Sequence, residues 1–190
     1  MDEESIVIVS GLPRSGTSMM MRMLERGGLE VLTDRIRRPD WDNPQGYYEF
    51  ERVKQIEQDK AWLEDAQGKA VKMISQLLHH LPPGRVYKVV FMRRKMDEIL
   101  ASQHRMLERR GEATDKISDR QMARLFRKHL ERVREWLDQQ PHFDVIYVSY
   151  NDVVENPLEE AETVSRFLNE ELDVRAMAEV VDPALYRQRA

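Results

Sequence analysis

Residues 6–24 read IVIVSGLPRSGTSMMMRML, and this stretch restricts the possible folds more than any other part of the chain. The run 6–9 is short, apolar and β-branched, which is typical of a strand buried on both faces. A loop with Gly11 and Pro13 follows, and the Met-rich pattern after it predicts a helix that ends at Gly27. A strand, a tight loop and a helix start aim several backbone N–H groups at one point. The stretch therefore predicts an anion-binding site.

The residues inside the loop indicate which anion is bound. Gly11 and Gly16 have the G-x-x-x-x-G spacing of a P-loop, but Thr17 occupies the position of the lysine that reaches the β- and γ-phosphates. A cation occurs earlier, at Arg14. A loop with this arginine and without that lysine favours a nucleotide with one transferable anionic group on its 5′-phosphate. The glycine spacing alone is also compatible with a bent strand–helix turn.

A second basic segment follows another buried-strand pattern, Tyr87–Met92. Arg93 and Arg94 come directly after this strand, and Ser102 lies eight residues beyond Arg94 on the helix predicted to follow. Residues 93–110 hold six Lys or Arg and three Asp or Glu, although the net charge of the chain is −4. A guanidinium can bind a phosphate through two hydrogen bonds, and a serine hydroxyl can donate a further one. The segment predicts a second anion site, with Arg93 as the alternative to Arg94. A charged helix start with a surface serine is the other interpretation.

The rest of the chain alternates predicted strands and helices. Ser118 and Gln121 have the spacing of a capping box at a helix start. The loop 33–48 has no clean period, and long loops in compact domains tend to be functional. The alternation predicts an α/β protein, a single domain over residues 1–190, whose parallel sheet binds ligands beyond the carboxyl ends of its strands. Further strands are expected at 29–32, 71–74 and 144–149, and further helices at 49–63, 75–81, 96–107, 118–137, 156–168 and 172–181.

The two anion motifs resemble those of one protein family. The string PRSGTS resembles the 5′-phosphosulfate-binding loop of sulfotransferases, and Arg94 with Ser102 resembles their 3′-phosphate motif. The resemblance implies a P-loop nucleotide-kinase-like architecture of about five parallel strands in the order 2-3-1-4-5. It also implies transfer of a sulfuryl group from 3′-phosphoadenosine 5′-phosphosulfate (PAPS) to a hydroxyl or amine, without a metal. The residues that it assigns to the 5′ end of the donor are Pro13, Arg14, Ser15, Gly16, Thr17 and Ser18.

The resemblance also identifies catalytic candidates, because the chain departs from the family pattern. The stretch 71–74 lacks the histidine that serves many cytosolic sulfotransferases as the base, and it keeps Lys72. Arg14 is expected to stabilise charge on the bridging oxygen. Met19 stands where many of these enzymes have the tryptophan that stacks on adenine.

The general base is expected to be a carboxylate of the loop 33–48 or of its end. Glu49 closes an N-P-x-G-Y-x-E stretch that similar bacterial proteins share, and Asp34, Asp40 and Asp42 are rivals on the same loop. An acid that caps the predicted helix is the alternative role for Glu49. Some sulfotransferases bring C-terminal basic residues to the 3′-phosphate, and a solvated tail is the alternative role for the two arginines here, Arg187 and Arg189.

Composition excludes several other classes of protein. The net charge of −4 gives no indication of nucleic acid or an anionic membrane as partner, and no apolar run reaches the ~18 residues of a membrane span. The start MDEES leads directly into the first strand, so no signal peptide is expected. The absence of cysteine excludes disulfides and fits a cytoplasmic location. His79 and His80 have no metal-ligand spacing, so no metal is expected. The acceptor and the oligomeric state are left open.

Two other functions are compatible with parts of this pattern. A nucleotide kinase or NTPase would need a P-loop lysine and usually an aspartate at a strand end for Mg²⁺, where the sequence has Thr17 and Met92–Arg93. A non-catalytic nucleotide-binding or scaffold domain would keep both loops without a base. Nucleotide binding without turnover on any acceptor would favour this second alternative.

Overall fold

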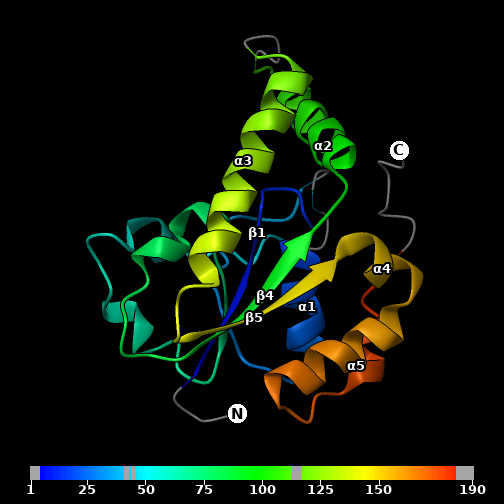
Figure 1. Cartoon of the computed structure of the whole chain (residues 1–190). Helices are drawn as coiled ribbons and strands as arrows, with labels where there is room; N and C mark the ends of the chain where they lie inside the picture. Colours follow the sequence, from blue (N-terminus) through cyan, green and yellow to red (C-terminus); the bar gives the residue numbers. More distant parts are fainter. Residues whose placement is uncertain (1–4, 41–42, 44–45, 113–116, 183–190) are drawn as a thin grey trace.

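A five-stranded parallel sheet forms the centre of the computed structural model, which describes residues 5–40, 43, 46–112 and 117–182 (Figure 1). The strand order is β2-β3-β1-β4-β5, and every neighbouring pair is parallel. The predicted α/β class, the sheet of about five parallel strands and the order 2-3-1-4-5 are therefore confirmed. The strands are β1 (Ile6–Gly11), β2 (Val31–Leu32), β3 (Ala70–Lys72), β4 (Tyr87–Arg93) and β5 (Phe143–Ser149).

The strand β1 lies in the middle of the sheet, and both of its faces are buried. Ile6 and Ile8 pack into the core on one face, whereas Val7 and Val9 pack into the core on the other. All six residues of β1 are buried, as the continuous apolar run predicts. The carboxyl end of this strand therefore starts the anion loop from a rigid position in the sheet.

Four helices cover the face that Val7 and Val9 occupy: α1 (Thr17–Arg26), α4 (Tyr150–Glu155), α5 (Pro157–Leu168) and α6 (Val174–Ala178) (Figure 1). The helix predicted at 156–168 is present as α5, with Pro157 at its first position. The short helix α4 was not predicted. It begins at the end of β5, where the Ser149 hydroxyl accepts the N–H of Asp152 at 3.3 Å.

Two long helices, α2 (Met96–Arg109) and α3 (Asp119–Leu137), form an arm that extends away from the sheet beyond β4 (Figure 1). The predicted capping box is present at the start of α3. The N–H of Ser118 donates to the Gln121 side chain at 3.2 Å, and the N–H of Gln121 donates to the Ser118 hydroxyl at 3.4 Å. The carboxyl-terminal end of α3 packs on the sheet face that Ile6 and Ile8 occupy.

The helix predicted at 49–63 is wrong. The chain forms two short 3₁₀-helices there, η1 (Glu51–Gln55) and η2 (Ala61–Leu63). The apolar residues Phe50, Val53 and Ile56 recur every three positions, which is the period of a 3₁₀-helix and not of an α-helix. A paired Arg52 and Asp59 hold the turn between the two pieces, with Nε and Oδ2 2.8 Å apart. The helix predicted at 75–81 is also 3₁₀, as η3 (Ser75–His80).

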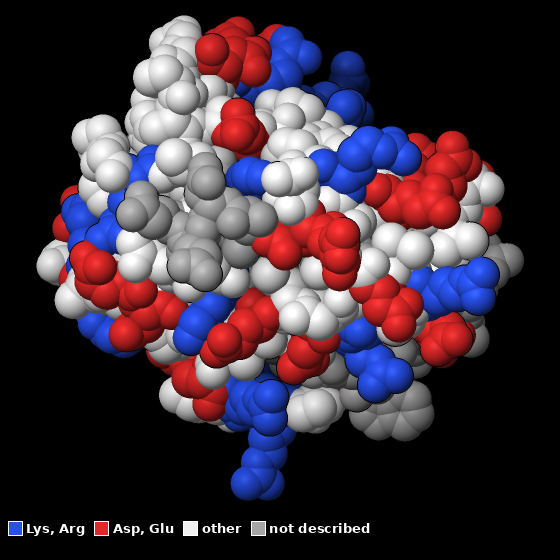
Figure 2. Space-filling model, turned by 90° about the horizontal axis from the view of Figure 1, so that it is seen from below, with Lys and Arg blue, Asp and Glu red and all other residues white. Residues whose placement is uncertain are grey.

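Charges of both signs are intermixed on the face at the amino ends of the strands, which is seen from below in Figure 2. The carboxyl ends of the strands lie on the opposite side, where α2 begins (Figure 1). None of the described helices has the length and apolar character needed to cross a bilayer.

Two glycines of the anion loop have no room for a side chain. Gly11 has φ +146°, and a Cβ built on it would lie 2.6 Å from the Met92 carbonyl oxygen and 2.5 Å from the Ser15 hydroxyl. Gly16 has φ +100°, and a Cβ there would lie 2.5 Å from the Tyr150 ring. The loop therefore packs directly on β4 and on α4.

We expect Gly11→Ala to lower the free energy of unfolding by about 3 kcal/mol, because the added methyl group meets the backbone of β4 and the left-handed φ is strained. Gly84→Ala is the matched control, since Gly84 has φ +93° and nothing within 4 Å of its built Cβ. This control should lose only about 1 kcal/mol. Urea denaturation measures both values, and equal losses would contradict the close packing at Gly11.

Candidate functional site

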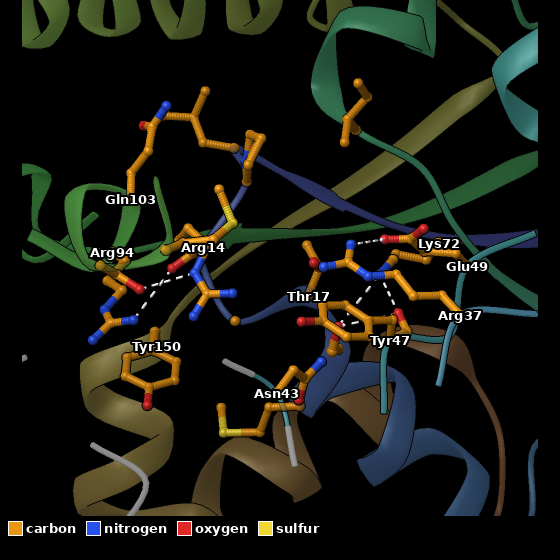
Figure 3. A pocket seen from close by; sticks show the side chains of 18 of the residues that line it. Arg14, Thr17, Arg37, Asn43, Tyr47, Glu49, Lys72, Arg94, Gln103 and Tyr150 are labelled. Atoms are coloured by element: carbon orange, nitrogen blue, oxygen red, sulfur yellow. Dashed lines mark hydrogen bonds and ion pairs between the residues drawn. The ribbon is translucent and has the colours of Figure 1, made fainter. Parts of the chain in front are cut away.

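A cavity of about 440 Å³ opens at the carboxyl ends of β1 and β3, beside the second half of α2 (Figure 3). Its wall includes residues of the loop after β1, the start of α1, the end of β3, α2, α4 and the described part of the loop at 33–40, 43 and 46–50, called the strap below. All but one of the predicted site residues line this cavity: Pro13, Arg14, Gly16, Thr17, Ser18, Glu49, Lys72, Arg94 and Ser102.

The exception is Ser15, which is not in the cavity wall. Its side chain is buried and lies against Gly11, and its N–H donates to the Leu12 carbonyl at 3.1 Å. The Ser15 hydroxyl has no hydrogen-bond partner among the described residues. Ser15 therefore belongs to the packing of the loop in this structure.

The start of α1 is built to receive an anion. Gly16 is the N-cap residue in the left-handed conformation, so no side chain accepts a hydrogen bond from the first turn. The first turn also has no acidic residue. The N–H groups of this turn and the positive end of the helix dipole therefore face the cavity without a counter-charge of their own.

On one side of the helix start, Arg94 is held by three elements (Figure 3). Its Nε donates to Glu98 at 2.8 Å on α2, and its Nη1 donates to the Arg14 carbonyl at 3.2 Å. Its guanidinium also lies 4.2 Å from the centre of the Tyr150 ring on α4. Glu98 is buried and accepts the Asn151 amide at 3.0 Å. This network fixes Arg94 at the cavity wall.

The alternative arginine, Arg93, does not line the cavity. It is exposed and lies 6.0 Å from the centre of the Tyr147 ring. Of the two neighbouring arginines, the geometry therefore favours Arg94 for the second anion site.

Arg14 connects the two predicted anion motifs. Its backbone is in the left-handed region with φ +72°, and its Nε donates to the Ser102 hydroxyl at 2.8 Å. Ser102 is buried on α2, one turn beyond Glu98. The loop after β1 and the helix after β4 thus meet side chain to side chain at one end of the cavity.

Lys72 lies on the other side of the helix start, at the end of β3 (Figure 3). Its ammonium donates to the Tyr47 carbonyl and, at 3.3 Å, to the Ser18 hydroxyl. Burial lowers the pKa of Lys72 to about 8, and the charges of Arg37 and Arg14 act in the same direction while Glu49 opposes them. The site therefore contains a cation that can lose its proton near neutral pH.

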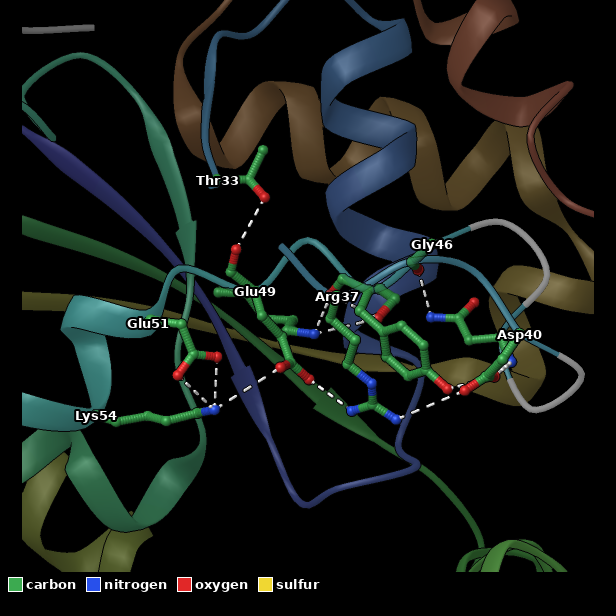
Figure 4. Close-up of polar contacts among 11 residues, drawn as sticks. Thr33, Arg37, Asp40, Gly46, Glu49, Glu51 and Lys54 are labelled. Carbon is green, nitrogen blue, oxygen red and sulfur yellow. Dashed lines mark hydrogen bonds and ion pairs between the residues drawn. The ribbon is translucent and has the colours of Figure 1, made fainter. Parts of the chain in front are cut away.

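Glu49 is the carboxylate that the strap presents to the cavity (Figure 4). Its Oε1 accepts Nη1 of Arg37 at 2.9 Å, and the Lys54 ammonium lies 3.9 Å from its Oε2. Its carbonyl accepts the Thr33 hydroxyl at 2.9 Å. Glu49 precedes η1. The N–H of Glu51, in the first turn of η1, donates to the Asp34 carboxylate. Glu49 therefore does not accept this N–H group of the first turn.

The rival carboxylates are used elsewhere. Asp34 accepts that Glu51 N–H at 2.6 Å, and Asp40 accepts the Tyr47 hydroxyl. Neither of the two lines the cavity. Asp42, Arg187 and Arg189 lie outside the described residues.

Sequence reasoning missed three side chains of the cavity wall. Arg37 lies 3.3 Å above the centre of the Tyr47 ring and connects it to Glu49. Burial, and the hydrogen bond to Asp40, raise the pKa of Tyr47 to about 12, so its hydroxyl stays protonated at neutral pH. Tyr150 lies under Arg94. Arg37 lies in a loop with no periodic pattern, and Tyr150 follows a strand but belongs to no recognisable motif. The local sequence therefore does not mark either of them as a site residue. The repeated tyrosines next to Glu49 were the available signal for Tyr47.

The fold and the site together define an α/β protein with a cationic cavity at the carboxyl ends of its parallel strands. An uncapped helix start lies between two cationic groups, Arg14 with Arg94 on one side and Lys72 on the other (Figure 3). This arrangement fits a ligand with two separate anionic groups. Among the described residues, no group of three or more His, Asp or Glu is placed to hold a metal.

The sulfotransferase domain family matches residues 4–187 of this 190-residue chain. The chain belongs to this family, and the sequence resemblance is confirmed. No match was found in the comparison with curated proteins.

Solved structures share the fold at low sequence identity. The sulfotransferase domain of the olefin synthase of Synechococcus PCC 7002 is 15% identical, with a TM-score of 0.61 over 98% of this chain and 88% of that chain. STF1 from Mycobacterium tuberculosis H37Rv is 18% identical, with a TM-score of 0.61 over 96% and 73%. Mouse SULT7A1 complexed with PAP is 18% identical, with a TM-score of 0.54 over 95% and 63%.

The pKa of Lys72 gives a pH dependence for anion binding. Below pH 8 the ammonium is charged, and above pH 8 the ligand-free protein loses this charge. A bound anion favours the charged form, so binding takes up a proton at high pH. We expect the affinity for adenosine 3′,5′-bisphosphate to be nearly level around pH 7, to begin to fall as the pH nears 8, and above this to fall by a factor that approaches tenfold per pH unit.

Isothermal titration calorimetry from pH 7 to about 9.5 measures this profile. Lys72→Met is the control, which should bind more weakly and show no fall over the same range. A flat profile for the wild type, or the same slope in Lys72→Met, would contradict the assignment.

Proposed function

We propose that this protein transfers a sulfuryl group from PAPS to a hydroxyl or amine of an acceptor. One observation supports this proposal most strongly. The residues of the loop after β1 lie around one uncapped helix start, together with Lys72, Arg94 and Ser102 from other elements. PAPS has two anionic ends, and the cavity has two cationic sides. The mouse relative is complexed with PAP, which supports the same class of donor here.

The 5′ end of the donor is assigned to the start of α1. The N–H groups after Gly16 and the hydroxyls of Thr17 and Ser18 would donate to the phosphosulfate, with Lys72 beside them. The 3′-phosphate is assigned to Arg94 and Ser102. Because the side chain of Glu98 already holds the guanidinium of Arg94, this cation is oriented before a ligand arrives.

The chemistry of the transfer is an in-line displacement, and the protein contributes positioning and charge stabilisation. PAPS, when bound, supplies the sulfuryl group and the bisphosphate leaving group. A bond forms between the acceptor oxygen and sulfur, the bond from sulfur to the bridging oxygen breaks, and the bridging oxygen keeps the electron pair. We assign stabilisation of the charge on that oxygen to Arg14 and Lys72, and uptake of the acceptor proton to the Glu49 carboxylate.

A non-catalytic nucleotide-binding domain is the competing function. The same cavity would then bind the donor, and Glu49 would only anchor the strap through Arg37 and Thr33. Binding and turnover therefore need separate tests.

The first test concerns the nucleotide. We expect adenosine 3′,5′-bisphosphate to bind at least about a hundredfold more tightly than AMP, because Arg94 and Ser102 give charge-assisted hydrogen bonds to the 3′-phosphate only. Ser102→Ala should reduce this ratio about tenfold. Ser102 is a better target than Arg94, whose removal would leave the buried Glu98 without its ion pair.

Calorimetric titration of both nucleotides measures the ratio. Arg93→Gln is the matched control, since Arg93 is adjacent but outside the cavity wall, and it should keep the ratio. If AMP binds as tightly as the bisphosphate, the 3′-phosphate site and the proposed donor are wrong.

The second test concerns the base. Glu49→Gln keeps the shape of the side chain and removes its proton acceptor, so we expect the transfer rate to fall at least ~100-fold while bisphosphate binding is retained. Glu51→Gln is the control, because Glu51 pairs with Lys54 at 2.7 Å but does not line the cavity. Transfer of labelled sulfate from PAPS measures the rates. Activity of Glu49→Gln near that of the wild type would leave Glu49 as an anchor of the strap.

A further inference from the structure

The face of α2 that lines the cavity continues beyond the assigned nucleotide site. Ser102 and Arg105 are three residues apart and Arg109 follows four later, so the three lie on one face of the helix. Arg110, which caps the helix, also lines the cavity. At 1.5 Å per residue this row extends about 12 Å from Ser102 to Arg110. The helix points away from the sheet, so the row leads out of the nucleotide site (Figure 1).

The proposed donor does not account for these arginines. Its 5′ end is assigned to the start of α1 with Lys72, and its 3′-phosphate to Arg94 with Ser102. Arg105 and Arg110 are exposed, and the ion pairs within the described part of the chain do not include them. Two guanidinium groups of the cavity wall are therefore placed to bind a further anion.

Apolar side chains form another part of the same cavity wall. Phe50 comes from the strap, Ile74 and Leu77 come from the segment after β3, and Met106 comes from α2. Ile74 is 42% exposed although it is a large apolar residue. A ligand with an apolar segment would cover Ile74 and gain the free energy of removing this surface from water.

The charges of the cavity contrast with those of the whole molecule. The chain has a net charge of −4, and charges of both signs are mixed on the opposite face (Figure 2). Among the described residues of the cavity wall, the acidic ones are Glu49 and Asp182, and the basic ones are Arg14, Arg37, Lys54, Lys72, Arg94, Arg105, Arg109 and Arg110. The field at the cavity therefore attracts anionic ligands in general.

We propose that the acceptor is itself an anion: a hydroxylated molecule with an apolar segment and a negatively charged group that binds Arg105 and Arg110. This inference rests on the proposed function, since it names the substrate class of that site. The apolar segment lies against Phe50, Ile74 and Leu77, and the hydroxyl lies at Glu49. Acceptor selection then depends on a charge that is remote from the reacting oxygen.

Matched acceptors of two charges test this inference. The probes are ω-hydroxyalkanoates of six, nine and twelve carbons and the primary amides of the same lengths, which differ in charge but hardly in size. Binding to protein saturated with adenosine 3′,5′-bisphosphate is measured by calorimetry, and sulfate transfer from PAPS is measured in parallel. One exposed ion pair of this kind raises the binding affinity about threefold. Ion pairs with both Arg105 and Arg110 should therefore make the carboxylate bind about tenfold more tightly than the amide at the best chain length.

The double variant Arg105→Gln/Arg110→Gln should bring this preference close to one and keep the bisphosphate affinity within about twofold. In the wild type, screening by 0.5 M NaCl should also bring the preference close to one. Arg124→Gln/Arg132→Gln is the matched control. It removes the same charge from exposed positions of α3 outside the cavity wall and should keep the preference.

The outcomes separate the two proposals. If the bisphosphate binds and no carboxylate is preferred over its amide at any length, the anionic acceptor is wrong and the proposed donor remains. If the double variant weakens bisphosphate binding tenfold or more, the arginines belong to the donor site and the inference is also wrong. If the wild type does not bind the bisphosphate, the proposed function is wrong, and so is the inference that rests on it.

Discussion

The structure of the site depends on one helix start that has no acceptor of its own. The first turn of α1 begins at Gly16, whose left-handed backbone and contact with the Tyr150 ring leave no room for a capping side chain. Its N–H groups face a cavity instead of a polar side chain. Parallel strands on both sides of β1 deliver Lys72 and Arg94 to this same point, so the helix start and two cations can bind an anion together.

The cations around this point are oriented by protein contacts. Arg94 is held by the buried Glu98, and Arg14 is held by Ser102. This arrangement lowers the entropy lost on binding, and it explains why a buried ion pair is kept next to a ligand site. Lys72 is different, because it donates hydrogen bonds to two neutral groups, the Tyr47 carbonyl and the Ser18 hydroxyl, and its burial lowers its pKa to about 8.

Much of this was predictable from the sequence for a definite physical reason. A strand buried on both faces must be apolar throughout, and a parallel sheet brings the ends of its strands to one edge, so the loop after Val9 and the residues after Met92 were expected to be neighbours. The remainder depends on tertiary contacts. The two 3₁₀-helices η1 and η2 were predicted as one long helix, because a period of three was interpreted as one side of an α-helix. Arg37 reaches Glu49 across the strap, and Tyr150 contacts Gly16 from another element, so no local pattern records either contact.

If the two anionic ends of one nucleotide occupy the two sides of this helix start, a crystal structure of the complex with adenosine 3′,5′-bisphosphate should show both contacts. We expect the 5′-phosphate within hydrogen-bond distance of the N–H groups of Thr17 and Ser18. We expect the 3′-phosphate on Arg94 and the Ser102 hydroxyl. A nucleotide bound in the reverse direction, or with its 3′-phosphate in solvent away from Arg94, would contradict it.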